Sequence, residues 1–194
     1  MKKQLVSFAL AFAFVVPSAA SAAQWDVDPA HSQANFSVRH MTVSTVRGTF
    51  TGISGTFDID EKDPTKGQID VAIDVNTVDT KVEKRDQHLK SPDFFDPAKY
   101  PAMTFKATKI TGKKGKYKVH GDLTIRDKTK PVVLDVTTTG PVKSPWGQTV
   151  VGVEATTTIN RQDFGVAWNN KLETGGLVVG NEVKIDLALE LIKK

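Results

Sequence analysis

The stretch Lys118-Val119-His120-Gly121-Asp122-Leu123-Thr124-Ile125 alternates apolar or small residues with polar ones, position by position. Successive side chains of a β-strand point to opposite faces, so a period of two predicts a strand with one apolar and one wet face. The same pattern recurs at 35–40, 56–59, 70–75, 132–136, 153–159 and 183–191. Turn-forming residues such as those at 112–115 and 127–131 separate these segments. The chain is therefore predicted to be all-β and antiparallel.

Repeated alternation of this kind predicts at least eight strands in a closed barrel or a sandwich. Closure would remove the sheet edges that invite aggregation, and a barrel of about eight strands can hold one small ligand. Periodicity by itself does not choose between the two architectures. Because no interior linker, composition shift or repeat divides the chain, we expect one domain over 23–194.

The segment 80–90 departs from the strand pattern and predicts one short helix. Thr80 and Glu83 have the spacing of a capping box, in which each side chain satisfies the free backbone amide of the other residue. Val82 and Leu89 would lie on one face of this helix. A short helix inserted between strands is expected to cap one end of a barrel.

The first residues have the composition of a secretory signal peptide. Lys2 and Lys3 precede an apolar run from Leu5 to Val16, and Ala20-Ser21-Ala22 is a small-residue cleavage site. This run is too short to span a bilayer, which needs about 20 apolar residues. We therefore expect cleavage of 1–22 after Ala22 and a periplasmic location. The absence of cysteine excludes a lipid-anchored cysteine and leaves stability to the core alone.

The charge balance argues against nucleic acid as a partner. The chain has 26 Lys+Arg, 22 Asp+Glu and a formal net charge of +4. Two of these positive charges, on Lys2 and Lys3, belong to the predicted signal peptide. No long block of like charge remains, and lysines 113, 114 and 116 stand beside glycines, where a solvated hairpin tip is expected.

Four groups of motifs occur in order along the chain. They are Asp28-Pro29-Ala30-His31-Ser32 with 36–40, Gly48-Thr49-Phe50 with Gly55-Thr56-Phe57, the block from Arg85 to Phe105, and 121–125 with 129–132; segments 160–165 and 179–183 add two more. Together they resemble the YceI-like family of periplasmic, lipocalin-like proteins that carry polyisoprenoid lipids. The resemblance covers essentially the whole chain after the leader. It implies an extended, lipocalin-like antiparallel barrel that encloses an isoprenoid or similar long-chain lipid.

A long-chain lipid requires an apolar tunnel, and its polar head requires donors or water at an open end. His40 shares the apolar face of its strand and fits a core histidine better than a ligand contact, while Trp168 is expected to flank the opening. The apolar candidates could equally fill a packed core. The residues expected to line the lipid cavity are Phe36, Val38, His40, Phe50, Phe57, Phe105, Val119, Leu123, Trp168 and Leu187.

Residues in and just after the predicted helix, from Arg85 to Phe95, form what we call the helix block, and we assign them structural roles. Arg85 and Asp86 are expected to pair and to anchor the helix to the barrel. His88 could reach either the cavity mouth or the strand after Tyr100. One of the two side chains at Phe94 and Phe95 is expected to plug the barrel end. Outside this block, Arg161 is expected to hold a turn at a strand end.

Signals for an enzyme are weak, so no catalytic residue, metal ligand or cofactor is expected. Gly52-Ile53-Ser54-Gly55 does not have the glycine spacing of a nucleophile elbow. The histidines at 31, 40, 88 and 120 lack metal-binding spacing. An enzyme acting on an amphiphilic substrate and a structural module are the competing classes.

The expected function is that of a carrier for an isoprenoid of polyprenyl or quinone type. A fatty-acid or fatty-amide binder on the same barrel is the alternative. The expected partner is this amphiphilic lipid, with no stable membrane insertion. A homodimer is allowed by the sequence but not indicated by it.

Overall fold

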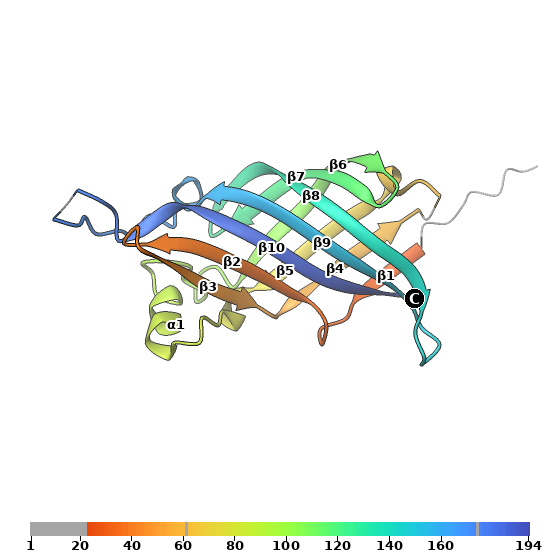
Figure 1. Cartoon of the computed structure of the whole chain (residues 1–194), viewed down its shortest axis with the longest axis horizontal. Coiled ribbons are helices and arrows are strands. Elements are labelled where there is room, and N and C mark those ends of the chain that lie inside the picture. The colour runs from red at the N-terminus through yellow and green to blue at the C-terminus, as the bar shows by residue number, and fades with distance from the viewer. Residues whose placement is uncertain (1–22, 61, 174) are drawn as a thin grey trace, which may run out of the picture.

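The computed structural model is an elongated antiparallel β-barrel with one short helix at one end (Figure 1). It describes residues 23–60, 62–173 and 175–194. The signal peptide predicted over 1–22 lies outside the described residues. No helix in the described part of the chain has the length and apolar character needed to cross a membrane.

Strands dominate the described chain, with a few short helical turns between them. In order, the elements are β1 (Ala23–Val27), β2 (Gln33–His40), β3 (Ser44–Phe50), β4 (Ile53–Ile59), η1 (Pro64–Lys66), β5 (Gln68–Asp74), η2 (Val75–Thr77), α1 (Glu83–Leu89), β6 (Ala102–Lys113), β7 (Lys116–Ile125), β8 (Lys128–Lys143), β9 (Thr149–Asn160), η3 (Arg161–Phe164) and β10 (Val179–Lys193).

Strand β10 closes the barrel because it has partners along both of its edges. One edge pairs with β9, from Glu182 to Ile192. The other edge pairs with β2 from Val179 to Ala188 and then with β1 from Leu191 to Lys193. Since β1 also pairs with β4, the ring runs β1-β4-β5-β6-β7-β8-β9-β10 and returns to β1. This eight-stranded antiparallel ring confirms the predicted barrel, and the β2–β3 hairpin extends it at one end.

The segment 28–32 connects β1 to β2 and allows both strands to pair with the same edge of β10, one after the other. The backbone N–H of Asp28 donates to the carbonyl of Glu190 at 2.8 Å. The hydroxyl of buried Ser32 accepts from the N–H of Glu190 at 3.0 Å and donates to its carbonyl at 3.4 Å. Because a buried backbone group must find a partner, the Ser32 hydroxyl satisfies β10 where the ladder is interrupted.

The apolar faces predicted from the alternation point into the barrel. On β7, Val119, Gly121 and Ile125 are buried, whereas Lys118 and Asp122 are exposed. The same inward face on the other strands forms one contiguous cluster of buried and half-buried apolar side chains. The burial observed on β7 therefore confirms the predicted two-faced strand.

The chain from β5 to β6, including α1, covers the outer edge of β3 (Figure 1). Thr49 of β3 exchanges two backbone hydrogen bonds of 2.9 Å with Asp79 in this connection. Helix α1 begins at Glu83, later than predicted, and the proposed capping box is wrong. Its N-cap residue, Val82, makes no side-chain capping bond, and the hydroxyl of Thr80 donates to Asp86 instead.

Arg85 and Asp86 anchor the helix through a third residue. Oδ1 of Asp86 accepts from the backbone N–H of Thr80 at 2.9 Å and from its hydroxyl at 2.6 Å. Nε of Arg85 donates to that hydroxyl oxygen at 2.7 Å, and Nη2 donates to the Thr80 carbonyl at 2.8 Å. Thr80 is only 5% exposed, so both charged side chains hold a buried point of the connection.

Replacing Asp86 should therefore destabilise the fold. Asp86→Ala removes both bonds and leaves the Thr80 N–H buried without an acceptor, so the free energy of unfolding should fall by about 1–3 kcal/mol. Chemical denaturation measures this loss. Asp93→Ala is the matched control, because Asp93 is exposed and bonds only the His88 ring at 3.0 Å among side chains. Equal losses in the two variants would contradict the anchoring role.

Candidate functional site

The barrel encloses an apolar cavity of about 370 Å³ towards the end where α1 lies. Its wall includes every residue that the sequence analysis assigned to a cavity, although their part in ligand binding stays a prediction. These residues are Phe36, Val38, His40, Phe50, Phe57, Phe105, Val119, Leu123, Trp168 and Leu187. Most of them are half-buried rather than buried, because they face this space instead of packing against one another.

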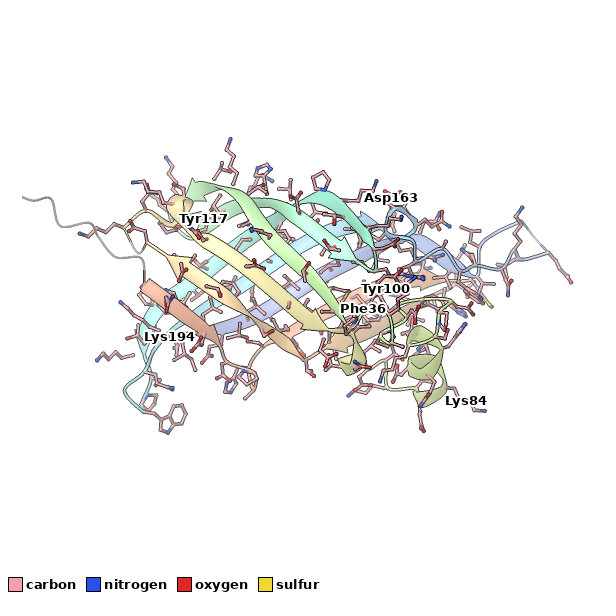
Figure 2. All side chains as sticks on the ribbon, turned by 180° about the vertical axis from the view of Figure 1, so that it is seen from behind. Phe36, Lys84, Tyr100, Tyr117, Asp163 and Lys194 are labelled. Atoms are coloured by element: carbon pink, nitrogen blue, oxygen red, sulfur yellow. The ribbon has the colours of Figure 1, made fainter. Side chains whose placement is uncertain are left out.

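A second cavity of about 710 Å³ continues along the barrel axis. The two cavities share wall residues, which are Phe57, Ile69, Val119, Val136 and Val153. The outer part of the second cavity is lined by Lys114 and Tyr117 from the β6–β7 hairpin and by Gly140 and Pro141 from β8. Figure 2 shows Tyr117 and Lys194 at one end of the molecule and Lys84, on α1, at the other. The two cavities thus adjoin across these shared side chains and follow one another between the two ends.

Two glycines allow phenylalanine rings to lie against the barrel wall. A Cβ atom at Gly48 would come within 2.5 Å of the Phe36 ring, and one at Gly121 within 2.4 Å of the Phe105 ring. Only a residue without a side chain leaves room for such a close approach between neighbouring strands. The Phe36 ring therefore lies directly over the backbone of Gly48, and the Phe105 ring over the backbone of Gly121, at the wall of the cavity.

Aromatic side chains from separate segments meet at the α1 end of the cavity. The His88 ring lies edge-on to Phe94, with ring centres 4.9 Å apart, and edge-on to Trp168 at 5.0 Å. Phe95 packs edge-on against Phe50 of β3 at 5.6 Å. Both Phe94 and Phe95 line the cavity. The sequence analysis had expected only one of the two rings to close the end of the barrel. His88 also lines the cavity at this end.

The ionisable side chains that line the first cavity are all arginine or histidine. They are Arg39, His40, Arg85, His88 and Arg161, and within the described residues no aspartate or glutamate lines this cavity. Arginine offers only hydrogen-bond donors, and each histidine offers at least one. This end of the cavity therefore suits a ligand group that accepts hydrogen bonds or carries negative charge.

Arg161 is buried and holds the connection between β9 and β10. Its guanidinium donates to the carbonyl oxygens of Val166, Trp168, Val179 and Gly180, the last at 2.9 Å. Burial lowers the pKa of this guanidinium from its usual value. The carbonyl bonds agree with the turn-holding role predicted for Arg161, and they place a cation at the cavity wall.

Arg126 is a structural residue that sequence reasoning missed. Its Nη1 donates to the carbonyl of Phe94 at 2.9 Å and to that of Gly165 at 3.1 Å. The guanidinium also lies 5.4 Å from the centre of the Tyr100 ring. Arg126 thereby ties the β7–β8 turn to two other connections at the cavity mouth. A lone arginine in a polar turn carries no sequence signal for this role.

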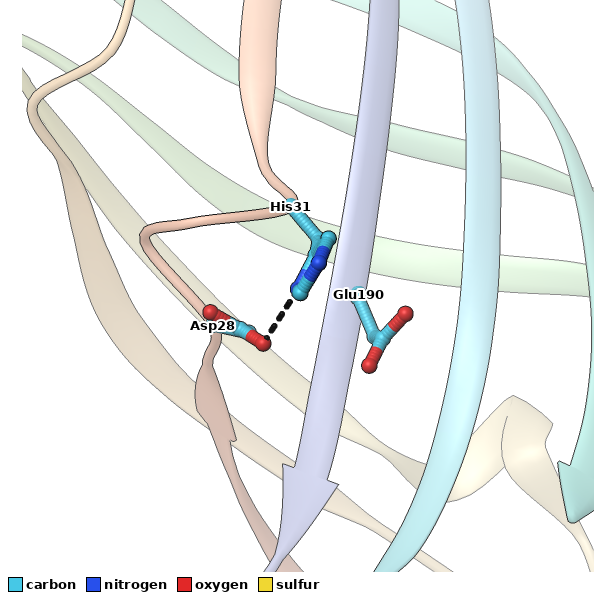
Figure 3. Close-up of side chains that lie close together, drawn as sticks. All are labelled: Asp28, His31 and Glu190. Carbon is cyan, nitrogen blue, oxygen red and sulfur yellow. Dashed lines mark hydrogen bonds and ion pairs between the residues drawn. The ribbon is translucent and has the colours of Figure 1, made fainter. Parts of the chain in front are cut away.

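A second cluster lies on the outside of the barrel (Figure 3) and joins Asp28, His31 and Glu190. Nδ1 of His31 lies 2.7 Å from Oδ2 of Asp28, and one donor atom from each residue lies within 4.8 Å of the others, close enough to hold a metal ion. Their hydrogen bond raises the pKa of His31 and lowers the pKa of Asp28. Sequence spacing did not indicate this cluster because Glu190 belongs to the last strand.

The Asp28–His31 pair should make stability depend on pH. Because its pKa is raised, His31 contributes its full stabilisation of the fold at pH values below its unfolded-state pKa of about 6.5. This stabilisation is lost as the pH rises through the pKa of the folded state. Asp28 has a lowered pKa, so it contributes its full stabilisation at pH values above its unfolded-state pKa of about 3.8. This stabilisation is lost as the pH falls through the pKa of the folded state. The stability difference between wild type and His31→Gln should therefore be larger near pH 5.5 than near pH 9. Denaturation at both pH values measures it, and an equal difference would contradict the pairing.

Phe105 and Leu123 distinguish an open cavity from a packed core. In a packed core, Phe105→Ala would cost about 3–5 kcal/mol. Beside an existing cavity we expect a smaller loss in the ligand-free protein, because the truncation only enlarges a space already present. Leu123→Trp should fill part of the cavity, which lowers uptake of an apolar fluorescent probe while the fold melts normally. A full core penalty for Phe105→Ala together with undiminished probe uptake by Leu123→Trp would contradict the cavity.

Sequence relatives cover nearly the whole chain. The profile of the YceI-like domain matches residues 25–191. A UPF0312 protein of Vibrio parahaemolyticus is 35% identical over 194 residues, which cover 98% of this chain and 97% of the relative. A protein YceI of Salmonella newport is 37% identical over 168 residues, which cover 86% of this chain and 88% of the relative.

Solved structures share the fold. Burkholderia cenocepacia BcnA has a TM-score of 0.73 at 27% identity, covering 85% of this chain and 99% of its own. The YceI protein of Campylobacter jejuni has a TM-score of 0.69 at 31% identity, covering 80% and 90%. A polyisoprenoid binding domain from Saccharophagus degradans, with a TM-score of 0.65, covers 88% and 98% but is only 19% identical, which is a likeness of fold. The chain described here therefore belongs to the YceI-like domain family.

Proposed function

We propose that this protein binds a long-chain isoprenoid lipid of polyprenyl or quinone type inside the barrel and carries it through the periplasm. The observation that supports this most directly is the elongated apolar space formed by two adjoining cavities of about 370 and 710 Å³. A long, narrow apolar space suits a chain-like ligand better than a compact one. The periplasmic part of the proposal depends on the leader predicted over 1–22.

The mechanism is reversible burial of the lipid chain. Each methylene removed from water contributes about 0.8 kcal/mol, so ten buried groups of this size would contribute about 8 kcal/mol before the cost of ordering the chain. A net 8 kcal/mol corresponds to a dissociation constant of about 1 μM. A longer isoprenoid offers more such groups, and hence tighter binding for a cavity that can enclose it.

The polar head is proposed to lie at the α1 end. The arginine and histidine side chains there supply hydrogen-bond donors, and quinone carbonyl or phosphate oxygens accept hydrogen bonds. Arg85 and Arg161 already bond protein oxygens, so the head group would join an organised set of donors. A fatty acid remains the second candidate, because its carboxylate would meet the same donors.

Binding is proposed in preference to catalysis. The described wall of the first cavity contains no carboxylate, serine or cysteine, and its one hydroxyl side chain, Thr157, forms no hydrogen bond with His40 or His88. The domain from Saccharophagus degradans, which shares the fold, is described as a polyisoprenoid binding domain. For this chain that ligand class is part of the proposal.

Protein purified without detergent should contain a lipid. Organic extraction followed by mass spectrometry is expected to yield an isoprenoid with an acceptor head group, near one molecule per chain. The Leu123→Trp variant, purified in parallel, should yield less, because the added ring occupies cavity space. Protein that is consistently empty, and that also fails to take up ubiquinone or a polyprenyl probe, would rule out the carrier. A fatty acid or amide as the extracted lipid would favour the second candidate.

A further inference from the structure

We propose that the end of the barrel opposite α1 docks on a membrane surface of anionic phospholipid, through the β8–β9 and β6–β7 hairpins. Figure 1 shows the β8–β9 hairpin beside the C-terminal end, remote from α1. The contact is peripheral and reversible. This surface goes beyond the proposed function, and the docking does not depend on which lipid the barrel carries.

The first observation is an exposed tryptophan at the tip of the β8–β9 hairpin. Trp146 is 83% exposed, and nearby Val142 is 56% exposed. The tip is an ordered turn, since the N–H of Ser144 donates to the Gln148 carbonyl at 2.8 Å and the N–H of Gly147 donates to the Ser144 carbonyl at 3.0 Å. Tryptophan is enriched at membrane–water interfaces, where its ring is buried and its N–H stays wet. The hairpin therefore holds an interfacial anchor away from the barrel.

The second observation is positive charge on the other hairpin at this end of the barrel (Figure 1). The β6–β7 hairpin, 109–118, contains five lysines and no acidic residue. Those at 113, 114 and 116 are exposed, as is Lys143 next to Val142. The β6–β7 tip joins the strand that leads into the β8–β9 hairpin, because the N–H of Thr138 on β8 donates to the carbonyl of Gly115 at 2.9 Å. Lysines near an anionic membrane surface strengthen attachment to it.

Two described acidic residues of the neighbouring β4–β5 connection, Asp60 and Asp63, form local bonds. Oδ1 of Asp60 accepts from the backbone N–H groups of Lys62 and Asp63. Asp63 itself pairs with Lys66, with Nζ and Oδ2 3.1 Å apart. Asp63 is thus paired with a cation, whereas Asp60 bonds only backbone N–H groups and keeps its charge. On the hairpin, Lys118 pairs with Asp135 of β8, with Nζ and Oδ1 2.5 Å apart. The attraction to an external anion therefore depends on the exposed lysines 113, 114 and 116.

The third observation is that the interior reaches the surface at this same end. Exposed Lys114, Gly140 and Pro141 line the outer part of the second cavity. If the head group lies at the α1 end, as proposed above, the tail of the bound lipid points towards these hairpins. A barrel standing on its hairpins would hold the lipid in the orientation that it has in a leaflet, with the tail towards the bilayer. Cargo could then pass without being inverted.

The opposite end is the competing surface. Val43, at the β2–β3 turn, is 75% exposed, and Met41 and Val82 are also exposed. Charges around that end are of both signs, as in the pairs Lys81–Asp79 and His88–Asp93. The docking end also has ion pairs, such as Lys118–Asp135, but the tip of its β6–β7 hairpin adds lysines 113, 114 and 116 with no acidic residue between them. This tip should attract an anionic surface more strongly than the paired charges near α1 do. Val43→Ser is therefore the matched control for a substitution at the docking end.

Co-sedimentation with phosphatidylglycerol–phosphatidylcholine vesicles tests the docking on delipidated protein. Wild type should bind, and Trp146→Ser should bind less. Replacing lysines 113, 114 and 116 by serine should lower the partition coefficient about fivefold per lysine, the equivalent of about 1 kcal/mol each. Added salt should weaken wild-type binding, because the attraction is screened within about 10 Å at 0.1 M.

Fluorescence identifies the side chain that enters the interface. Of the three tryptophans, Trp25 is buried and Trp146 is the most exposed, so a blue shift and quenching by brominated lipid should disappear in Trp146→Phe. Val43→Ser should bind as wild type does. Absence of wild-type binding, or loss of binding in Val43→Ser but not in Trp146→Ser, would overturn the docking proposal. Uptake of ubiquinone from ethanol solution, measured on Trp146→Ser, tests the carrier function separately and should be unchanged.

Discussion

The rest of the structure depends on the two-sided pairing of β10. A strand that bonds β9 along one edge and both β2 and β1 along the other has no edge left open, and it turns a meander into a ring. The interruption between β1 and β2 is tolerated because Ser32 supplies side-chain bonds to the backbone of Glu190. Barrel closure thus rests on a hydroxyl in a short turn as well as on ladder hydrogen bonds.

Closure also decides what the interior can do. Inward side chains of an eight-stranded ring need not fill it, and here they leave an elongated apolar space instead of a fully packed core. The two ends of this space differ in chemistry. Arginine, histidine and aromatic rings gather at the α1 end, whereas the far end is framed by lysine, glycine and proline on two hairpins. The proposed ligand would place its polar head among the donors of the α1 end and its tail along the apolar walls of the two cavities.

The helix block shows where local reasoning succeeds and where it fails. A short helix after Thr80 was predictable from the interrupted alternation, but its capping was not, because the Thr80 hydroxyl bonds Asp86 and Arg85 rather than starting the helix. Capping motifs describe contacts within one helical turn. In this protein the buried position of Thr80 against the edge of β3 requires other partners. Tertiary packing therefore overrides the local motif.

The sequence by itself determined seven of the described strands and their inward faces, because side chains that alternate with a period of two point to opposite faces of the sheet. Strands β1, β3 and β6 were not among the alternating segments. Alternation left barrel and sandwich open, and the barrel was expected only from the family resemblance. The pairing of β10 with both β1 and β2 along one edge, and the meeting of Glu190 with Asp28 and His31, were decided only by tertiary structure. So were the Arg126 bonds and the division of the interior into two cavities. Each of these depends on register between strands distant in the chain, and alternation carries no information about which strands pair.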